Sequence, residues 1–201
     1  MYEWRKLNER QRDELLSWRR TMRYPWHSPP HRTSDRGLYH ITAACYLHQP
    51  VIGYSPARMS AFSDQLLASL GHHASAIHAW CVLPNHYHAM IATPDILSLL
   101  AALGKLHGRT SYTWNGEENR RGRQIWCKAA ERDMRSDRHR WATLNYVHHN
   151  PVHHGYARRW QDWPYSSARE YLASVGRAEA QRAWREYPVR DYGKGWDAPD
   201  L

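Results

Sequence analysis

The sequence predicts an α+β fold, a ferredoxin-like βαββαβ antiparallel sheet that carries its helices on one face. Two observations lead to this fold class. Segments in which apolar and polar residues alternate indicate half-buried strands, and segments with apolar residues three and four apart, opened by a hydroxyl residue and a proline, indicate helices. Their order along the chain is strand, helix, strand, strand, helix, strand, which is the order of a split βαβ sheet.

Each predicted element has its own local signal of alternation, capping or turn residues. The elements are a strand over 38–47, a helix opened by Ser55-Pro56, a strand over 77–83, a strand over 86–91, a helix opened by Thr93-Pro94 and closed by Asn115-Gly116, a short strand over 124–127, and a helix over 137–149 ended by Asn150-Pro151. We divide the chain into a basic N-terminal helix and linker (1–36), a core domain (37–172) and a largely irregular C-terminal tail (173–201).

The predicted hairpin around Pro84-Asn85 places two histidines on one side of a strand. His86 and His88 are two residues apart, so their side chains share a face that Tyr87 does not. Two imidazoles held on a paired strand can bind one metal ion. The alternative is a pair of surface histidines in a chain that contains 15. In the predicted topology the first strand lies beside this one, which makes His40 either a neighbour of the pair or a structural histidine.

The segment WCVLPNHYHAMI resembles the His-hydrophobic-His signature of the HUH tyrosine transposases, most closely that of the REP-associated branch. Four other segments agree with this family in the right order. They are LYHITA near residue 40, GRQIW near 125, LNYVHHNPVHHGY at 144–156 and DWPYSSAREY at 162–171. A bare His-x-His is common, but five segments in order indicate a member of the family over roughly residues 37–172.

The resemblance implies metal-dependent cleavage and strand transfer of single-stranded DNA, the chemistry of DNA transposition and recombination. In the family, a tyrosine hydroxyl attacks a phosphodiester, giving a 5′-phosphotyrosine and a free 3′-OH. A divalent cation, Mg²⁺ or Mn²⁺, held by His86 and His88 would polarise the scissile phosphate. Imidazole pairs also bind zinc and nickel well, so the residues do not fix the metal. The implied substrate is a REP-like hairpin flanked by a single-stranded tetranucleotide.

The chain departs from the family at the nucleophile. In the family a tyrosine follows the Trp of GxxW within a few residues, but no tyrosine lies between Trp114 and Tyr146 here. Depending on the alignment, Cys127, Ala129 or Ala130 occupies its position.

Three explanations of the missing tyrosine are open. The chain is a variant that binds DNA without cutting it, or the fold brings in Tyr112 or Tyr146, or Cys127 is the nucleophile. We favour the first, because a thiolate is a poor match for attack on a phosphodiester and a structural cysteine is commoner.

A third metal ligand usually comes, in this family, from the helix that carries the tyrosine. Glu131 lies four residues after Cys127, so on a helix the two would share a face and Glu131 could reach the metal. Asp133 and His139 are weaker candidates. Any of these acids could instead pair with a neighbouring arginine.

The chain is basic, with 28 Lys and Arg against 19 Asp and Glu and a formal net charge of +9. This balance suits a polyanionic partner such as DNA, whose phosphates such residues would contact without reading the sequence. The predicted DNA-binding residues are Lys105, Arg109, Arg120, Arg121, Arg123, Lys128, Arg132 and Arg135.

The remaining features fit a cytoplasmic protein. No apolar run is long enough for a membrane span, the charged start is no signal peptide, and the three cysteines are widely spaced. We expect a monomer, with a dimer as the alternative. Two hypotheses of function remain: a single-strand DNA endonuclease and transposase, or a DNA-hairpin-binding protein that has lost cleavage. A covalent protein–DNA adduct distinguishes them.

Overall fold

The computed structural model describes residues 8, 10, 11, 13, 14, 17 and 37–189. The chain divides into two compact units, Met1–Arg32 and Thr33–Leu201. Most of the predicted N-terminal helix, the linker after it and the last part of the predicted tail lie outside the described residues.

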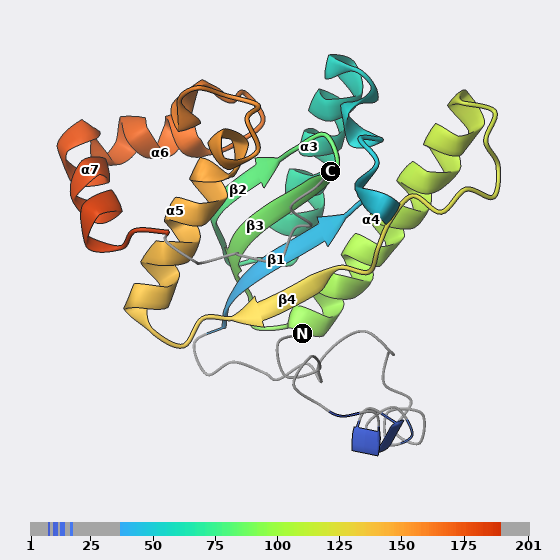
Figure 1. Cartoon of the computed structure of the whole chain (residues 1–201), viewed down its shortest axis with the longest axis horizontal. Helices are drawn as coiled ribbons and strands as arrows, with labels where there is room; N and C mark the ends of the chain where they lie inside the picture. Colours follow the sequence, from blue (N-terminus) through green and yellow to red (C-terminus); the bar gives the residue numbers. More distant parts are fainter. Residues whose placement is uncertain (1–7, 9, 12, 15–16, 18–36, 190–201) are drawn as a thin grey trace. The chain divides into compact units, whose positions relative to one another are not determined.

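Four antiparallel strands form one sheet in the order β2-β3-β1-β4 (Figure 1). Their bounds are β1 Leu38–Ala44, β2 Ala76–Val82, β3 His86–Ala92 and β4 Ala130–Asp133. The first strand lies between the third and the fourth, as a split βαβ arrangement requires. The predicted α+β, ferredoxin-like fold class is therefore confirmed.

The two crossover helices, α3 (Pro56–Gly71) and α4 (Ile96–Glu117), cover one face of the sheet. The core between them and the strands includes Ile41, Tyr87, Ile91, Phe62, Leu66, Leu99 and Leu103. Ser55 caps α3 as predicted, because its hydroxyl accepts the backbone N–H of Arg58 at 3.1 Å. The expected start of α4 at Thr93-Pro94 is early, since Asp95 is its N-cap.

A further helix, α5 (Asp137–His153), covers the opposite face. Leu144 and Val147 of α5 belong to a second core cluster with residues of β2 and β3. The helix continues through Pro151, so the predicted end at Asn150-Pro151 is wrong. A proline this close to the end of a helix removes a single backbone hydrogen bond.

The last strand of the sheet lies later than predicted, at Ala130–Asp133 in place of residues 124–127. Trp126 makes only an isolated bridge to Cys45. Its side chain holds the segment instead: the indole stacks on His107 with ring centroids 4.3 Å apart and donates a hydrogen bond to Thr110. The apolar signal at GRQIW therefore marks a core anchor and not a strand.

The C-terminal region is more regular than predicted. Two helices, α6 (Ala168–Val175) and α7 (Arg177–Glu186), lie beside α5, with Gly176 between them at a φ of 81° (Figure 1). A left-handed φ of this kind costs glycine little, and it lets α7 start directly after α6. Among the described residues, no helix is both long and apolar enough to cross a membrane.

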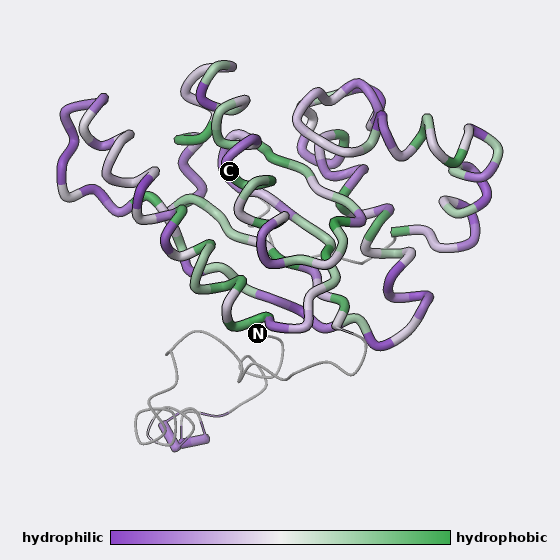
Figure 2. Tube along the Cα trace, turned by 180° about the vertical axis from the view of Figure 1, so that it is seen from behind, coloured by the Kyte–Doolittle hydropathy of each residue, from purple (hydrophilic) through white to green (hydrophobic). Residues whose placement is uncertain are grey.

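An ion-pair network joins the start of α3 to the end of α4. Arg58, whose side chain is 6% exposed, contacts Glu117 at 2.8 Å and Glu118 at 2.6 Å. Glu118 also pairs with Arg123 at 2.8 Å, and its hydrogen bond from that guanidinium is the main cause that lowers its pKa. Figure 2 shows this end of α4 and the following loop as a hydrophilic stretch.

Candidate functional site

The two histidines of the motif lie on the face of the sheet that α5 covers. His86 and His88 are each 1% exposed, and their rings are T-shaped with centroids 4.9 Å apart. Tyr87, between them, is buried on the opposite face in the α3–α4 core. The two imidazoles are thus adjacent, as the alternation of the strand predicts.

His40 lies beside this pair. Its strand is paired with β3 so that Thr42 faces His88, and the Nε2 atom of His40 is 3.2 Å from Nδ1 of His88. His40 is 2% exposed. The structure therefore brings the three histidines together, while a role of His40 toward a metal stays a prediction.

Helix α5 contributes a stripe of three side chains to the same place. Tyr146, Asn150 and His154 are spaced by four residues and so share one face of the helix. The Tyr146 ring lies 5.1 Å from that of His88, and the His154 ring 5.0 Å from that of His86. This stripe was not among the predicted site residues, although its spacing of four residues is a signal visible in the sequence.

The hydrogen bonds of His86 bear on whether the site suits a cation. Its Nδ1 is 2.7 Å from Oδ1 of Asn85, and its Nε2 is 3.0 Å from Oδ1 of Asn150. A neutral imidazole has only one N–H to donate, so two amide oxygens call for a second proton, a rotated amide or a cation. Nδ2 of Asn150 has no partner among the described residues.

The distance between His86 and Asn150 also suits a cation. Two ligands at right angles on a cation with bonds of about 2.1 Å lie about 3 Å apart. The available set is two imidazoles and one amide oxygen, because the described residues contain no group of three His, Cys, Asp or Glu able to hold a metal. A cation held here would therefore take two imidazoles and one amide oxygen from the chain, and would need water or phosphate in its other positions.

The predicted third ligand, Glu131, is not near the pair. It lies in β4 rather than on a helix. In the sheet it is paired with Ile41 of β1, whose side chain belongs to the α3–α4 core. Directly paired residues share a face, so Glu131 is on the side away from the histidines. Asp133, two residues further on, shares that side. His139 is in the first turn of α5, far along the helix from Asn150.

The three candidate nucleophile positions differ in where their side chains lie relative to the histidines. Ala130 is paired with Thr42, which is paired with His88, so Ala130 lies in the same row of the sheet and on the same face as His88. Ala129 is buried in the opposite core. Cys127 is exposed, and desolvation raises the pKa of its thiol, which disfavours the thiolate.

Of the two alternative tyrosines, only Tyr146 reaches the histidines. Tyr112 is 72% exposed near the end of α4, where its ring lies against the guanidinium of Arg121. Tyr146 is 4% exposed and also lies 5.9 Å from the His40 ring. A phosphate would have to enter the helix–sheet interface to meet the Tyr146 hydroxyl.

The structure does not bring the eight predicted DNA-binding residues together. Arg132 is paired with His40 on the neighbouring strand β1, and Lys128 is exposed in the segment before β4. Arg135, after β4, is 76% exposed and 3.5 Å from Asp133. Lys128 and Arg132 are each two residues from Ala130, and Arg135 lies beyond the end of β4.

The other five predicted residues are elsewhere. Lys105 and Arg109 line a hollow between α3 and α4, on the face away from the histidines. Arg123 is held by Glu118 and by the side chain of Asn115. Arg120 and Arg121 are in the loop after α4, where Arg121 donates to the Tyr112 carbonyl.

Comparisons with known proteins support the motif analysis. No protein-family model matches the chain. A curated protein of Haemophilus influenzae named "Putative REP-associated tyrosine transposase" is 28% identical over 141 residues, which cover 65% of this chain and 79% of that protein.

A solved structure shares the fold. It is that of a REP-associated tyrosine transposase bound to a REP hairpin, with a TM-score of 0.56 and 20% identity over 73% of this chain and 86% of that chain. The resemblance indicated by the motifs is therefore confirmed: this chain is similar to the REP-associated tyrosine transposases in sequence and in fold.

Proposed function

We propose that this protein binds hairpin DNA of the REP type and has lost the cleavage step of the tyrosine transposases that it resembles. One observation carries the proposal. Ala130 lies in the same row of the sheet as His88, at the position from which a tyrosine could reach His86 and His88. Its methyl group cannot attack a phosphate. The solved relative bound to a REP hairpin supports the choice of ligand.

The proposed DNA-contacting surface is the basic end of the sheet around β4. Lys128, Arg132 and Arg135 lie in and beside this strand, within one short segment. Guanidinium and ammonium groups neutralise phosphates and release counterions, which supplies affinity without base reading. A DNA ligand agrees with the expected cytoplasmic location and with a monomer bound to one hairpin, and both remain part of the proposal.

In this proposal the site formed by His86, His88 and Asn150 positions a DNA phosphate. His86, His88 and Asn150 would hold a divalent cation, with Mg²⁺ and Mn²⁺ as the proposed ions. When bound, such an ion supplies charge stabilisation to a phosphate oxygen. The chain's own residues orient these ligands: His40 contacts His88, and the Asn85 amide contacts Nδ1 of His86.

A second candidate function is cleavage with Tyr146 as the nucleophile. The observation that favours it is the 5.1 Å separation of the Tyr146 and His88 rings. Against it stands the place of Tyr146 in the chain: in the family the nucleophilic tyrosine follows the Trp of GxxW within a few residues, whereas Tyr146 lies on α5. We rank it below binding alone for this reason.

Removing two charges at β4 tests the binding proposal. For the double variant Lys128→Ala/Arg132→Ala, the slope of log affinity against log salt is expected to fall by roughly 1.4 to 1.8, about 0.7 to 0.9 for each lost phosphate contact. Fluorescence anisotropy with a labelled hairpin, across a range of salt concentrations, measures this slope.

The matched control removes two charges from the other face. Lys105→Ala/Arg109→Ala has the same net charge as the first variant, and these residues line the hollow between α3 and α4. We expect its salt slope to stay within error of the wild type. Failure of the wild type to bind the hairpin, or an equal loss in both variants, would contradict the proposal.

A further inference from the structure

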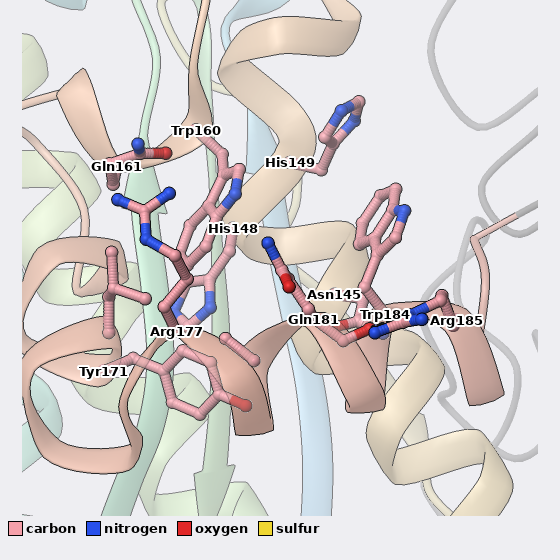
Figure 3. Close-up of a pocket in the computed structure, with 12 residues that line it drawn as sticks. Asn145, His148, His149, Trp160, Gln161, Tyr171, Arg177, Gln181, Trp184 and Arg185 are labelled. Carbon is pink, nitrogen blue, oxygen red and sulfur yellow. Dashed lines mark hydrogen bonds between the residues drawn. The ribbon is translucent and has the colours of Figure 1, made fainter.

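A second cavity lies on the other side of α5. It has a volume of about 550 Å³, is open to solvent on one side and is lined by α5, the short 3-10 helix η3 (Trp160–Asp162), α6 and α7 (Figure 3). Its α5 residues include Asn145 and His149. They are on a different face of the helix from the Tyr146 stripe. The cavity is therefore separate from the histidine site and falls within the size range of small-molecule sites.

Aromatic rings form the walls of this cavity. His148 lies near-parallel to Trp160, with an interplanar angle of 19° and centroids 5.9 Å apart, and 5.0 Å from the Tyr171 ring. Figure 3 shows these three rings on one side and Trp184 with Gln181 on the other. Flat aromatic faces of this kind bind nucleobases, because every base has a π-face.

Cationic groups lie at the same cavity. Arg177 and Arg185 line it, and neither forms an ion pair with a described residue. Arg177 is the first residue of α7, and Gly176 before it offers no side chain to cap the helix. The first backbone N–H groups of a helix and an arginine together form a site for an anion such as phosphate.

Two polar atoms beside the cavity have no partner among the described residues: Nδ1 of His148 and the hydroxyl of Tyr171. His148 is 3% exposed, and its Nε2 is 2.9 Å from the Ser167 hydroxyl. Burial lowers the pKa of His148 to about 3, so its ring is neutral at pH 7. Buried polar groups are normally hydrogen-bonded, and no described residue uses the hydrogen-bonding capacity of these two atoms.

We infer that this cavity binds one nucleotide, with the base between the walls formed by Trp160 and Trp184 and the phosphate at Arg177 and Arg185. Two sources supply this chemistry: an unpaired nucleotide in the flank of a bound DNA strand, or a free mononucleotide. The first source rests on the proposed hairpin-binding function, and the second does not.

The test for the DNA source compares two hairpins with the same stem, one blunt and one with a single-stranded flank. Fluorescence anisotropy at fixed salt measures both affinities. We expect the wild type to prefer the flanked hairpin by about tenfold, the scale of one base stacked on an aromatic ring. Trp184→Ala and Arg177→Ala should remove this preference and leave the affinity for the blunt hairpin unchanged.

Arg182→Ala is the matched control. Arg182 is exposed on α7, pairs with Glu179 at 2.6 Å and does not line the cavity. This variant loses the same charge as Arg177→Ala and should keep the preference. Thermal unfolding of each variant shows whether α7 remains folded. If Trp184→Ala unfolds, the result for Arg177→Ala decides the test, because the Arg177 side chain is exposed and its removal should not disturb the fold.

Calorimetric titration with deoxyadenosine monophosphate, and with inorganic phosphate for comparison, tests the free-nucleotide source. Heat of mononucleotide binding that is seen in the wild type and lost in Arg177→Ala supports the inference. If the wild type shows this heat but binds no hairpin, the proposed function fails and the inference stands. Equal affinity for the two hairpins together with no mononucleotide binding overturns the inference and leaves hairpin binding intact.

Discussion

Replacing Ala130 by tyrosine is expected to give the protein a DNA-cleaving activity. Ala130, Thr42 and His88 lie side by side on three strands, so a phenol at position 130 would extend over the face that holds the histidines. Its oxygen would bond to phosphorus as the bond to the 3′ oxygen breaks, leaving DNA covalently attached to the protein. A labelled hairpin that migrates with the protein on a denaturing gel, with Mn²⁺ and not with EDTA, measures this gain.

Neighbouring positions provide the controls for this gain of function. Ala129→Tyr should yield no adduct, because Ala129 belongs to the core on the opposite face. Adding His88→Ala to Ala130→Tyr should abolish the adduct. If Ala130→Tyr binds the hairpin and forms no adduct, or if Ala129→Tyr forms as much, the assignment of position 130 is wrong.

Arg58→Ala is expected to destabilise the protein by about 2 to 3 kcal/mol, the scale of losing buried hydrogen bonds to charged groups. The Arg58 side chain is 6% exposed and binds Glu117, Glu118 and the Val51 carbonyl. Its loss leaves Glu118 with Arg123 as its ion-pair partner and removes the donor to the Val51 carbonyl, which disconnects α3 from α4. Urea unfolding followed by circular dichroism measures the change.

An exposed ion pair is the control for the effect of Arg58→Ala on the free energy of unfolding. Arg159 pairs with Asp162 at 2.7 Å, but its side chain is 68% exposed. Exposed pairs contribute about 0 to 1 kcal/mol, so Arg159→Ala should change the free energy of unfolding by no more than that. Equal effects of the two substitutions would contradict the structural role of Arg58.

The pH dependence of stability follows from the same network. Arg123, and then Arg58, hold the pKa of Glu118 below its ordinary value of 4.5. Because the folded pKa is the lower one, this stabilisation is complete above pH 4.5 and is lost as the pH falls through the folded pKa. The melting temperature of the wild type should therefore approach that of Glu118→Gln in acid.

The sequence predicts the fold well where local periodicity and tertiary packing agree. The alternation around His86 and His88 correctly placed both on one face, and the order of elements correctly placed the strand of His40 beside theirs. Both faces of β3 are buried, so its alternation separates the apolar core under α3 and α4 from the histidine face under α5, and does not separate a buried face from an exposed one.

The fourth strand shows where such reasoning fails. Ala130–Asp133 reads AERD, with no strand signal, and it is extended because it pairs with β1. The apolar Ile125 and Trp126, which suggested a strand, are core residues. Misplacing this strand made Glu131 look like a helical metal ligand, and only the register shows that it is on the other face.

The helix side of the site was not predicted because two patterns overlap on α5. Leu144 and Val147 form an apolar stripe that packs in the core, while Tyr146, Asn150 and His154 form a second stripe that faces the histidines. Pro151 also suggested that the helix had ended before His154. The contact between a polar stripe and a strand far away in sequence is set by tertiary packing, which periodicity does not contain.

The most direct test of binding without cleavage uses the wild-type protein and one labelled hairpin with single-stranded flanks. Native gel shift reports binding, and a denaturing gel of the same samples, with Mn²⁺ or EDTA, reports covalent attachment. Hairpin DNA shifted in the native gel, with no label on the denatured protein under either condition, is the predicted result. Label that stays with the denatured protein would contradict it, and mass spectrometry would then show whether Tyr146 or Cys127 carries the DNA.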